Sequence, residues 1–196
     1  MIFRYTLNEH LEYFTYLSAT ESLREDHKQI KRLDKIIIKC YTELYTGKNI
    51  PLSDINKISL VIDEFLDSIH YSREEDSYFP CVASYDHLKE EIHKLLVEHE
   101  FSRRIALQIK KYLKLWKEGK DAREPVARYL KTYSTYLMDH MTKEENFFDK
   151  AEAEVLSKEE EYDMYEQFKS VMTISKKMED MIKEIEYLEN QSWFKN

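Results

Sequence analysis

Apolar side chains recur every three or four residues along most of the chain, and charged side chains fill the positions between them. This period places the apolar residues on one face of an α-helix. Only two Gly and three Pro occur among the 196 residues, so little interrupts the pattern. The pattern predicts an all-α protein built from a few long amphipathic helices.

Capping and helix-breaking residues divide this pattern into separate helices. Ser18 and Glu21 form a capping box at the start of the first long helix, and Gly47 ends that helix. The second long helix begins at Pro51. It is predicted to stop just before Pro80, because a proline disfavours helical geometry in the residue that precedes it.

Similar signals set the later helix boundaries. Gly119 ends the third long helix, and Pro125 lies in the first turn of the fourth. Ser157 and Glu160 form a second capping box, which opens a final helix over about residues 157–190. The apolar positions of this final helix are mixed with polar ones, so we expect it to cover part of the bundle.

The connections between consecutive long helices are short, which predicts an up-down-up-down antiparallel four-helix bundle. We expect a single domain over residues 1–196. Its core bundle covers about 18–150. A short N-terminal leader, with a short helix over 6–17, and the additional C-terminal helix complete the expected fold.

Composition limits the setting in which the protein works. The longest aliphatic runs, at residues 36–38 and 58–62, are far shorter than the roughly 20 apolar residues that span a bilayer. The first residues lack the layout of a signal peptide, and Cys40 and Cys81 form neither a CxxC motif nor a disulfide framework. A net charge of −8 argues against nucleic acid as a partner. We expect a cytoplasmic protein that binds neither nucleic acid nor membrane, in an oligomeric state that the sequence does not indicate.

Polar residues interrupt the apolar faces of all four long helices. The second and fourth helices each carry a histidine and a glutamate four residues apart, hence on one face about one turn apart. The first and third helices each carry one histidine on the inward face. The six residues are His27, His70, Glu74, His99, His140 and Glu144.

These six positions lie at similar heights in the predicted bundle. At roughly 1.5 Å per residue, they agree within about two helical turns. Burying four imidazoles and two carboxylates in an apolar core is costly unless a metal neutralises them. Imidazole combined with carboxylate suits iron, and a carboxylate can bridge two ions. We therefore expect one metal site formed by residues of all four long helices.

The segments around these residues resemble the four motif helices of the hemerythrin-like, or HHE cation-binding, domain family. The pattern is H…HxxxE…H…HxxxE in that order, and the resemblance covers about residues 18–190. The segments that carry it are residues 24–28, 69–75, 97–100 and 138–146.

The resemblance implies a centre of two iron ions joined by an oxo or hydroxo bridge. Glu74 and Glu144 would each bridge both irons. The remaining ligands are implied to be His27 and His70 on one iron, and His99 and His140 on the other.

Two features make the chain more similar to the repair-of-iron-centres proteins than to the oxygen-carrying hemerythrins. The oxygen carriers have a fifth histidine where this chain has Arg103. They also carry a longer-spaced aspartate on the last motif helix, where this chain has Glu144 in HxxxE. The repair proteins add an N-terminal segment with paired cysteines, which this sequence lacks.

We expect the other polar residues near the motifs to lie outside the metal site or to support its ligands. We expect His10, His87 and His93 to be surface or boundary residues, because they fall outside the arrangement. Glu75 and Glu145 either point away from the site or support its ligands. The imidazoles need supporting hydrogen bonds, which the sequence does not assign, although Glu98 and Asp139 each precede a ligand candidate. Tyr71, Tyr133 and Tyr136 are interpreted as packing residues near the site, with a redox role as the alternative.

Three functions remain open at this point. The favoured one is a non-haem di-iron protein that handles reactive oxygen or nitrogen species, such as nitric oxide or peroxide, or that delivers iron for repair. The alternative is a reversible dioxygen carrier or sensor, which Arg103 in place of a histidine disfavours. The third is a metal-free helical module that binds a protein partner. Only the first two use a small diatomic or peroxide ligand, and both need the six convergent residues.

Overall fold

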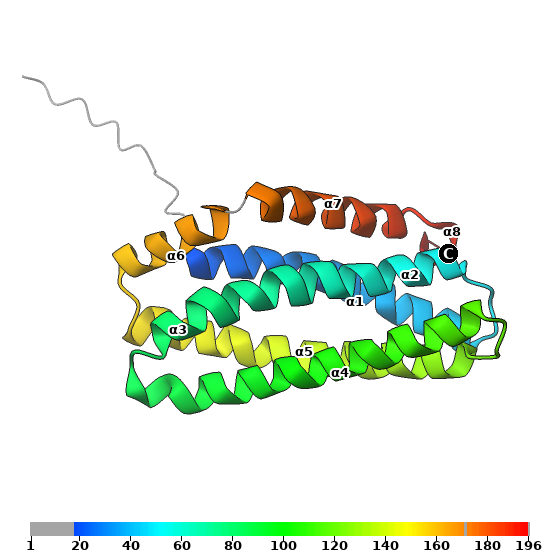
Figure 1. Ribbon diagram of the computed structural model, residues 1–196, viewed down its shortest axis with the longest axis horizontal. Coiled ribbons are helices and arrows are strands. Elements are labelled where there is room, and N and C mark those ends of the chain that lie inside the picture. Colours follow the sequence, from blue (N-terminus) through cyan, green and yellow to red (C-terminus); the bar gives the residue numbers. More distant parts are fainter. Residues whose placement is uncertain (1–17, 171, 196) are drawn as a thin grey trace, which may run out of the picture.

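Four long helical segments lie side by side and alternate in direction along the chain (Figure 1). A computed structural model describes residues 18–170 and 172–195, with the side chains of 172 and 173 left out. The predicted short helix at 6–17 lies outside the described residues. The segments are α1 (Ala19–Tyr45), a second segment from α2 to α3, α4 (Lys89–Lys117) and α5 (Arg123–Glu154).

Each long segment packs against two neighbours. α1 packs against α5, α5 against α4, α4 against α2 and α2 against α1. This cycle confirms the predicted antiparallel four-helix bundle. No helix in the described part of the chain is long and apolar enough to cross a membrane.

The predicted caps set several helix ends. Ser18 accepts a hydrogen bond from the backbone N–H of Glu21 at the start of α1. Gly47 and Gly119 have φ of 81° and 83°, and they follow the last turns of α1 and α4. This left-handed conformation is open to glycine because it has no Cβ.

The second segment departs from the predicted helix. It is a continuous helix made of α2 (Leu52–Val61), η1 (Ile62–Tyr71), η2 (Glu74–Tyr78) and α3 (Phe79–Val82), joined by helical residues 72 and 73. η1 and η2 are π-helical, with wider turns than an α-helix. The predicted stop before Pro80 is therefore wrong. Pro80 is the second residue of α3, close to the end of this continuous helix, which runs on to Val82 although Pro80 has no N–H to donate.

A short 3₁₀ turn, η3 (Asp86–Leu88), leads into α4. After α5, the predicted final helix is present as α6 (Lys158–Ser170) and α7 (Met172–Glu189), on either side of residue 171, and α8 (Ser192–Lys195) follows. Ser157 and Glu160 form the predicted reciprocal capping box before α6. α6 packs on α1 and η2, and α7 packs on α2, η1 and α1 (Figure 1).

The bundle interior contains two apolar clusters, which lie toward opposite ends of the long helices. The larger cluster includes Ile30, Phe65 and Leu137, and the smaller one includes Leu23 and Phe147. Along each long segment, the polar residues predicted to bind metal lie where one cluster gives way to the other. The apolar packing at both ends therefore fixes the four helices around a polar layer.

Candidate metal centre

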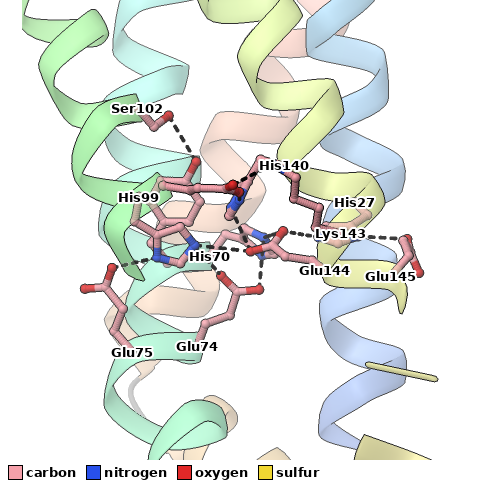
Figure 2. A network of polar contacts seen from close by, with 12 residues as sticks. His27, His70, Glu74, Glu75, His99, Ser102, His140, Lys143, Glu144 and Glu145 are labelled. Atoms are coloured by element: carbon pink, nitrogen blue, oxygen red, sulfur yellow. Dashed lines mark hydrogen bonds and ion pairs between the residues drawn. The ribbon is translucent and has the colours of Figure 1, made fainter. Parts of the chain in front are cut away.

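The six predicted site residues come together in this polar layer. All six side chains are buried, with exposed fractions of 0% or 1%. Their imidazole Nε2 atoms and carboxylate oxygens point toward one another in the bundle interior (Figure 2). The residues come from every long segment: His27 from α1, His70 from η1, Glu74 from η2, His99 from α4, and His140 and Glu144 from α5.

Glu144 divides its two oxygens between two pairs of histidines. Its Oε1 lies 2.8 Å from Nε2 of His140 and 3.1 Å from Nε2 of His99. Its Oε2 lies 3.3 Å from Nε2 of His27 and 4.0 Å from Nε2 of His70. One carboxylate therefore faces all four imidazoles.

Glu74 divides its oxygens in a similar way. Its Oε1 lies 3.5 Å from Nε2 of His70, and its Oε2 lies 3.4 Å from Nε2 of His99. Ligand atoms within 4.8 Å of one another form two groups that share Glu144. The groups are His27, His70, Glu74 and Glu144, and His99, His140 and Glu144.

The other ring nitrogen of each histidine faces a second carboxylate on a neighbouring helix. In a neutral imidazole whose Nδ1–H donates to a carboxylate, Nε2 has no proton and its lone pair points into the centre. Three of the pairs are at hydrogen-bond distance, and the fourth is longer. The Nδ1–oxygen distances are 2.8 Å for His27–Glu145, 2.7 Å for His99–Glu75, 2.9 Å for His140–Glu98 and 3.5 Å for His70–Asp26.

We call the four carboxylates that face the Nδ1 atoms the outer carboxylates, and Glu74 and Glu144 the inner carboxylates. A basic side chain contacts each outer carboxylate. The basic groups offset the negative charge around the site and restrict the carboxylates to one orientation. The closest nitrogen–oxygen distances are 2.9 Å for Arg73–Asp26, 2.9 Å for Arg103–Glu75, 2.6 Å for Lys143–Glu98 and 3.4 Å for Arg24–Glu145.

The two inner carboxylates differ in charge. Burial and the negative charge of Glu144 raise the pKa of Glu74 well above its usual value. Burial also opposes ionisation of Glu144, but the surrounding imidazoles, first of all His140, outweigh it and lower the pKa of Glu144. Burial disfavours the charged form of His140, yet Glu144 and Glu98 raise its pKa to about 9. Without metal, protons therefore supply positive charge to this buried carboxylate pair.

The donor set fits a metal ion. Several buried side-chain atoms lack a hydrogen-bond partner within the described residues, which is costly in an apolar interior. A cation bound here would use them as ligands, and their nitrogen and oxygen types suit iron or zinc. Those that face the centre are Nε2 of His27, His70 and His140, both carboxylate oxygens of Glu74, and Oε2 of Glu144.

Two further histidines lie away from this layer. His87 is exposed and contacts Glu154 on the surface, and His93 is exposed as well. These positions confirm the prediction for both residues, whereas His10 lies outside the described residues. Tyr71 is buried and donates a hydrogen bond to Ser102, as expected for a packing residue with a satisfied hydroxyl.

Sequence reasoning did not assign the outer carboxylates. Glu75 and Glu145 contact imidazoles, so their expected supporting position is the one observed. Glu98 also contacts an imidazole, whereas Asp139 pairs with Lys143 instead. Asp26 was missed altogether. One signal was present in the sequence, because each outer carboxylate is adjacent to a site residue on its own helix.

Comparison with known proteins agrees with the geometry. The model of the hemerythrin HHE cation binding domain matches residues 18–151, a span that contains all six site residues. No match was found among curated proteins or solved structures. The family match covers more than half of the chain and coincides with the four-helix bundle that encloses the site. The chain therefore belongs to the hemerythrin HHE cation-binding domain family.

Proposed function

We propose that the protein is a non-haem di-iron protein in which Glu74 and Glu144 bridge the two irons. The observation that carries the proposal is that both carboxylates turn one oxygen toward each side of the polar layer. A single tetrahedral zinc needs only three or four nitrogen or oxygen ligands and no bridging carboxylate. Two adjacent cations need anionic groups between them, because they repel each other.

The histidines would divide between the irons as they divide around Glu144. His27 and His70 would hold one iron, and His99 and His140 the other, which matches the two groups of ligand atoms. Bound iron would supply one-electron redox chemistry together with open positions for a small ligand. The protein's own part is to direct each Nε2 toward the metals through the contacts at Nδ1, to hold the carboxylates in place and to exclude bulk water.

Burial supports a small substrate. The six site residues are at most 1% exposed, so a large organic substrate has no direct contact with them. Nitric oxide, dioxygen and hydrogen peroxide are small enough to reach such a layer during local opening of side chains. We propose that the protein handles reactive oxygen or nitrogen species in the cytoplasm, or that it supplies iron for repair.

The surroundings of Arg103 favour this function over reversible dioxygen transport. Arg103 binds Asp67 and Glu75 and does not contact the Nε2 atoms at the centre. It therefore acts on the outer carboxylate of His99 and offers no fifth histidine ligand.

Iron loading tests the proposal directly. Protein loaded with Fe²⁺ without oxygen and then exposed to air should contain two irons per chain and show the absorption of a bridged ferric pair. Glu144→Ala should lower the content to one iron or none and abolish the absorption. Glu154→Ala is the matched control on the same helix, because Glu154 is exposed and pairs with the exposed His87 on the surface. Wild-type protein that binds no metal would support the partner-binding module, and colour that appears and fades with oxygen pressure would support the carrier.

A further inference from the structure

α6 lies beyond the residues that match the family, yet it packs against both helical segments of one half of the site. The matched residues end at 151, and α6 begins at Lys158. α6 contacts α1, which carries His27, and η2, which continues the segment that carries His70 (Figure 1).

The first anchor of α6 is a buried glutamate at the start of α1. Glu161 is 5% exposed and accepts hydrogen bonds from the backbone N–H and the hydroxyl of Thr20. The hydroxyl of Tyr78 lies 2.7 Å from the same Thr20 oxygen. Because the first N–H groups of a helix have no partner within the helix, Glu161 supplies a missing acceptor. This contact joins α6 to the helix that carries His27.

The second anchor reaches the site through a chain of contacts. The ring of Phe168, which is 4% exposed, lies 5.2 Å from the guanidinium carbon of Arg73. Arg73 donates a hydrogen bond of 2.9 Å to Asp26, and Asp26 lies 3.5 Å from Nδ1 of His70. The aromatic face attracts the cation and excludes water from it, which strengthens the attraction between Arg73 and Asp26.

In the other half of the site, the described contacts of the outer carboxylates come from the bundle. Arg103 contacts Asp67 of η1 and Glu75 of η2, and Lys143 contacts Glu98 of α4 and Asp139 of α5. Among the residues that the structure describes, the outer carboxylates of His99 and His140 are therefore held by side chains of the four-helix bundle.

We propose that α6 is a positioning element for the His27/His70 half of the metal centre. Phe168 holds Arg73 against Asp26, Asp26 orients His70, and the affinity of this half for its metal depends on that contact. The inference rests on the proposed two-metal function. Because linkage is reciprocal, metal in this half strengthens the docking of α6 by the same factor.

Calorimetric titration of metal-free protein with Fe²⁺ under nitrogen tests the coupling. Phe168→Ala should weaken one of the two sites about tenfold, within the range seen when groups that support metal ligands are changed, and leave the other site unchanged. The matched control is Ile185→Ala on α7, which removes an equally buried apolar side chain from the other cluster. Both variants should unfold at lower temperature than the wild type, but only Phe168→Ala should lose iron affinity. Phe168→Leu keeps most of the apolar burial and should weaken the site less.

Two further measurements separate positioning from general destabilisation. In an Arg73→Met background, Phe168→Ala should no longer change iron affinity, because the contact that transmits it is gone. Hydrogen exchange of the α6 amides should slow when iron binds, in wild-type protein and in Ile185→Ala but not in Phe168→Ala.

Unchanged affinity in Phe168→Ala, or equal weakening of both sites, would overturn the proposal while the di-iron function stands. Wild-type protein that takes up no Fe²⁺ would overturn both.

Discussion

The phenol ring of Tyr71 lies face to face with the imidazole of His99, with ring centroids 3.8 Å apart and an angle of 15° between the planes. Tyr71 is also within ring-contact distance of His70 and His140. Its hydroxyl donates to Ser102 on the neighbouring α4. A single buried side chain therefore packs against three of the four histidines of the site.

This packing predicts different results for two substitutions of Tyr71. Tyr71→Ala should destabilise the protein by about 3–5 kcal/mol, because it leaves a cavity beside the imidazoles. Tyr71→Phe keeps the ring and removes one hydrogen bond, so its cost should be about 1 kcal/mol. Urea unfolding of both variants measures the difference. If Tyr71→Phe were as unstable as Tyr71→Ala, the hydroxyl and not the ring would make the main contribution of Tyr71 to stability.

A second prediction separates two acidic residues that share one lysine. Lys143 contacts both Glu98 and Asp139, at 2.6 and 2.7 Å, but only Glu98 reaches Nδ1 of His140. Glu98→Ala should lower iron affinity by roughly 10–100-fold, because the imidazole loses the group that orients it. Asp139→Ala removes the same formal charge beside the same lysine and should leave the affinity within about twofold. Equal losses in the two variants would mean that surface charge sets the affinity.

A third prediction concerns the metal-free protein at different pH values. The folded state holds a proton on His140 with a pKa of about 9, against an ordinary value of 6.5. This raised pKa contributes stability below about pH 6.5 that is lost as the pH rises through 9. Glu74, whose pKa is also raised, changes stability in the same direction. The melting temperature of metal-free protein should therefore fall between pH 6.5 and 9, by roughly 5–10 °C.

Iron-loaded protein provides the control for the pH series. Metal replaces the protons at the centre, so its melting temperature should change little over this range. The carboxylates of the site whose pKa values are lowered, namely Glu75, Glu98, Glu144 and Glu145, affect stability only at acid pH and leave this window clear. A metal-free protein that becomes more stable from pH 6.5 to 9 would contradict the protonated state of His140.

The fourth prediction is that removal of metal loosens the bundle without unfolding it. Metal that binds only the folded state adds stability that grows with its concentration. The two apolar clusters on either side of the site remain intact without it. A chelator should therefore lower the melting temperature while the helical circular dichroism at 25 °C stays almost unchanged. Equal melting temperatures with and without chelator would count against a buried structural site.

The long helices and their order followed from periodicity and capping residues, since these signals are local. Ser18, Gly47 and Gly119 act where the sequence predicted, because capping depends on the backbone of one turn. The π-helical turns around His70 and Glu74 left no such local signal. The predicted end before Pro80 was wrong, because the effect of a proline on the residue before it is a local preference, and the helix continues through Pro80 to Val82.

The six residues at the centre of the candidate site could be predicted from the sequence, because a histidine or glutamate on the apolar face of a helix is unusual. The outer carboxylates could not be predicted in this way, because acidic residues at partly exposed positions are common on any helix. Glu98 and Asp139 have the same relation to a neighbouring histidine in sequence, and only the distance between α4 and α5 separates their roles. Such pairings depend on the rotation of one helix against the next.

Because each outer carboxylate is adjacent to an inner residue, the contacts of the site depend on the register between neighbouring helices. Asp26 of α1 serves the histidine of η1, Glu75 of η2 that of α4, Glu98 of α4 that of α5, and Glu145 of α5 that of α1. Each long segment thus carries a ligand candidate and, one position away, the carboxylate that contacts a histidine on a neighbouring segment. Slippage of any helix by one residue turns it by about 100° and breaks contacts to two neighbours at once. All four contacts form together only in one register of the four helices, and a bound metal would stabilise that register over the others.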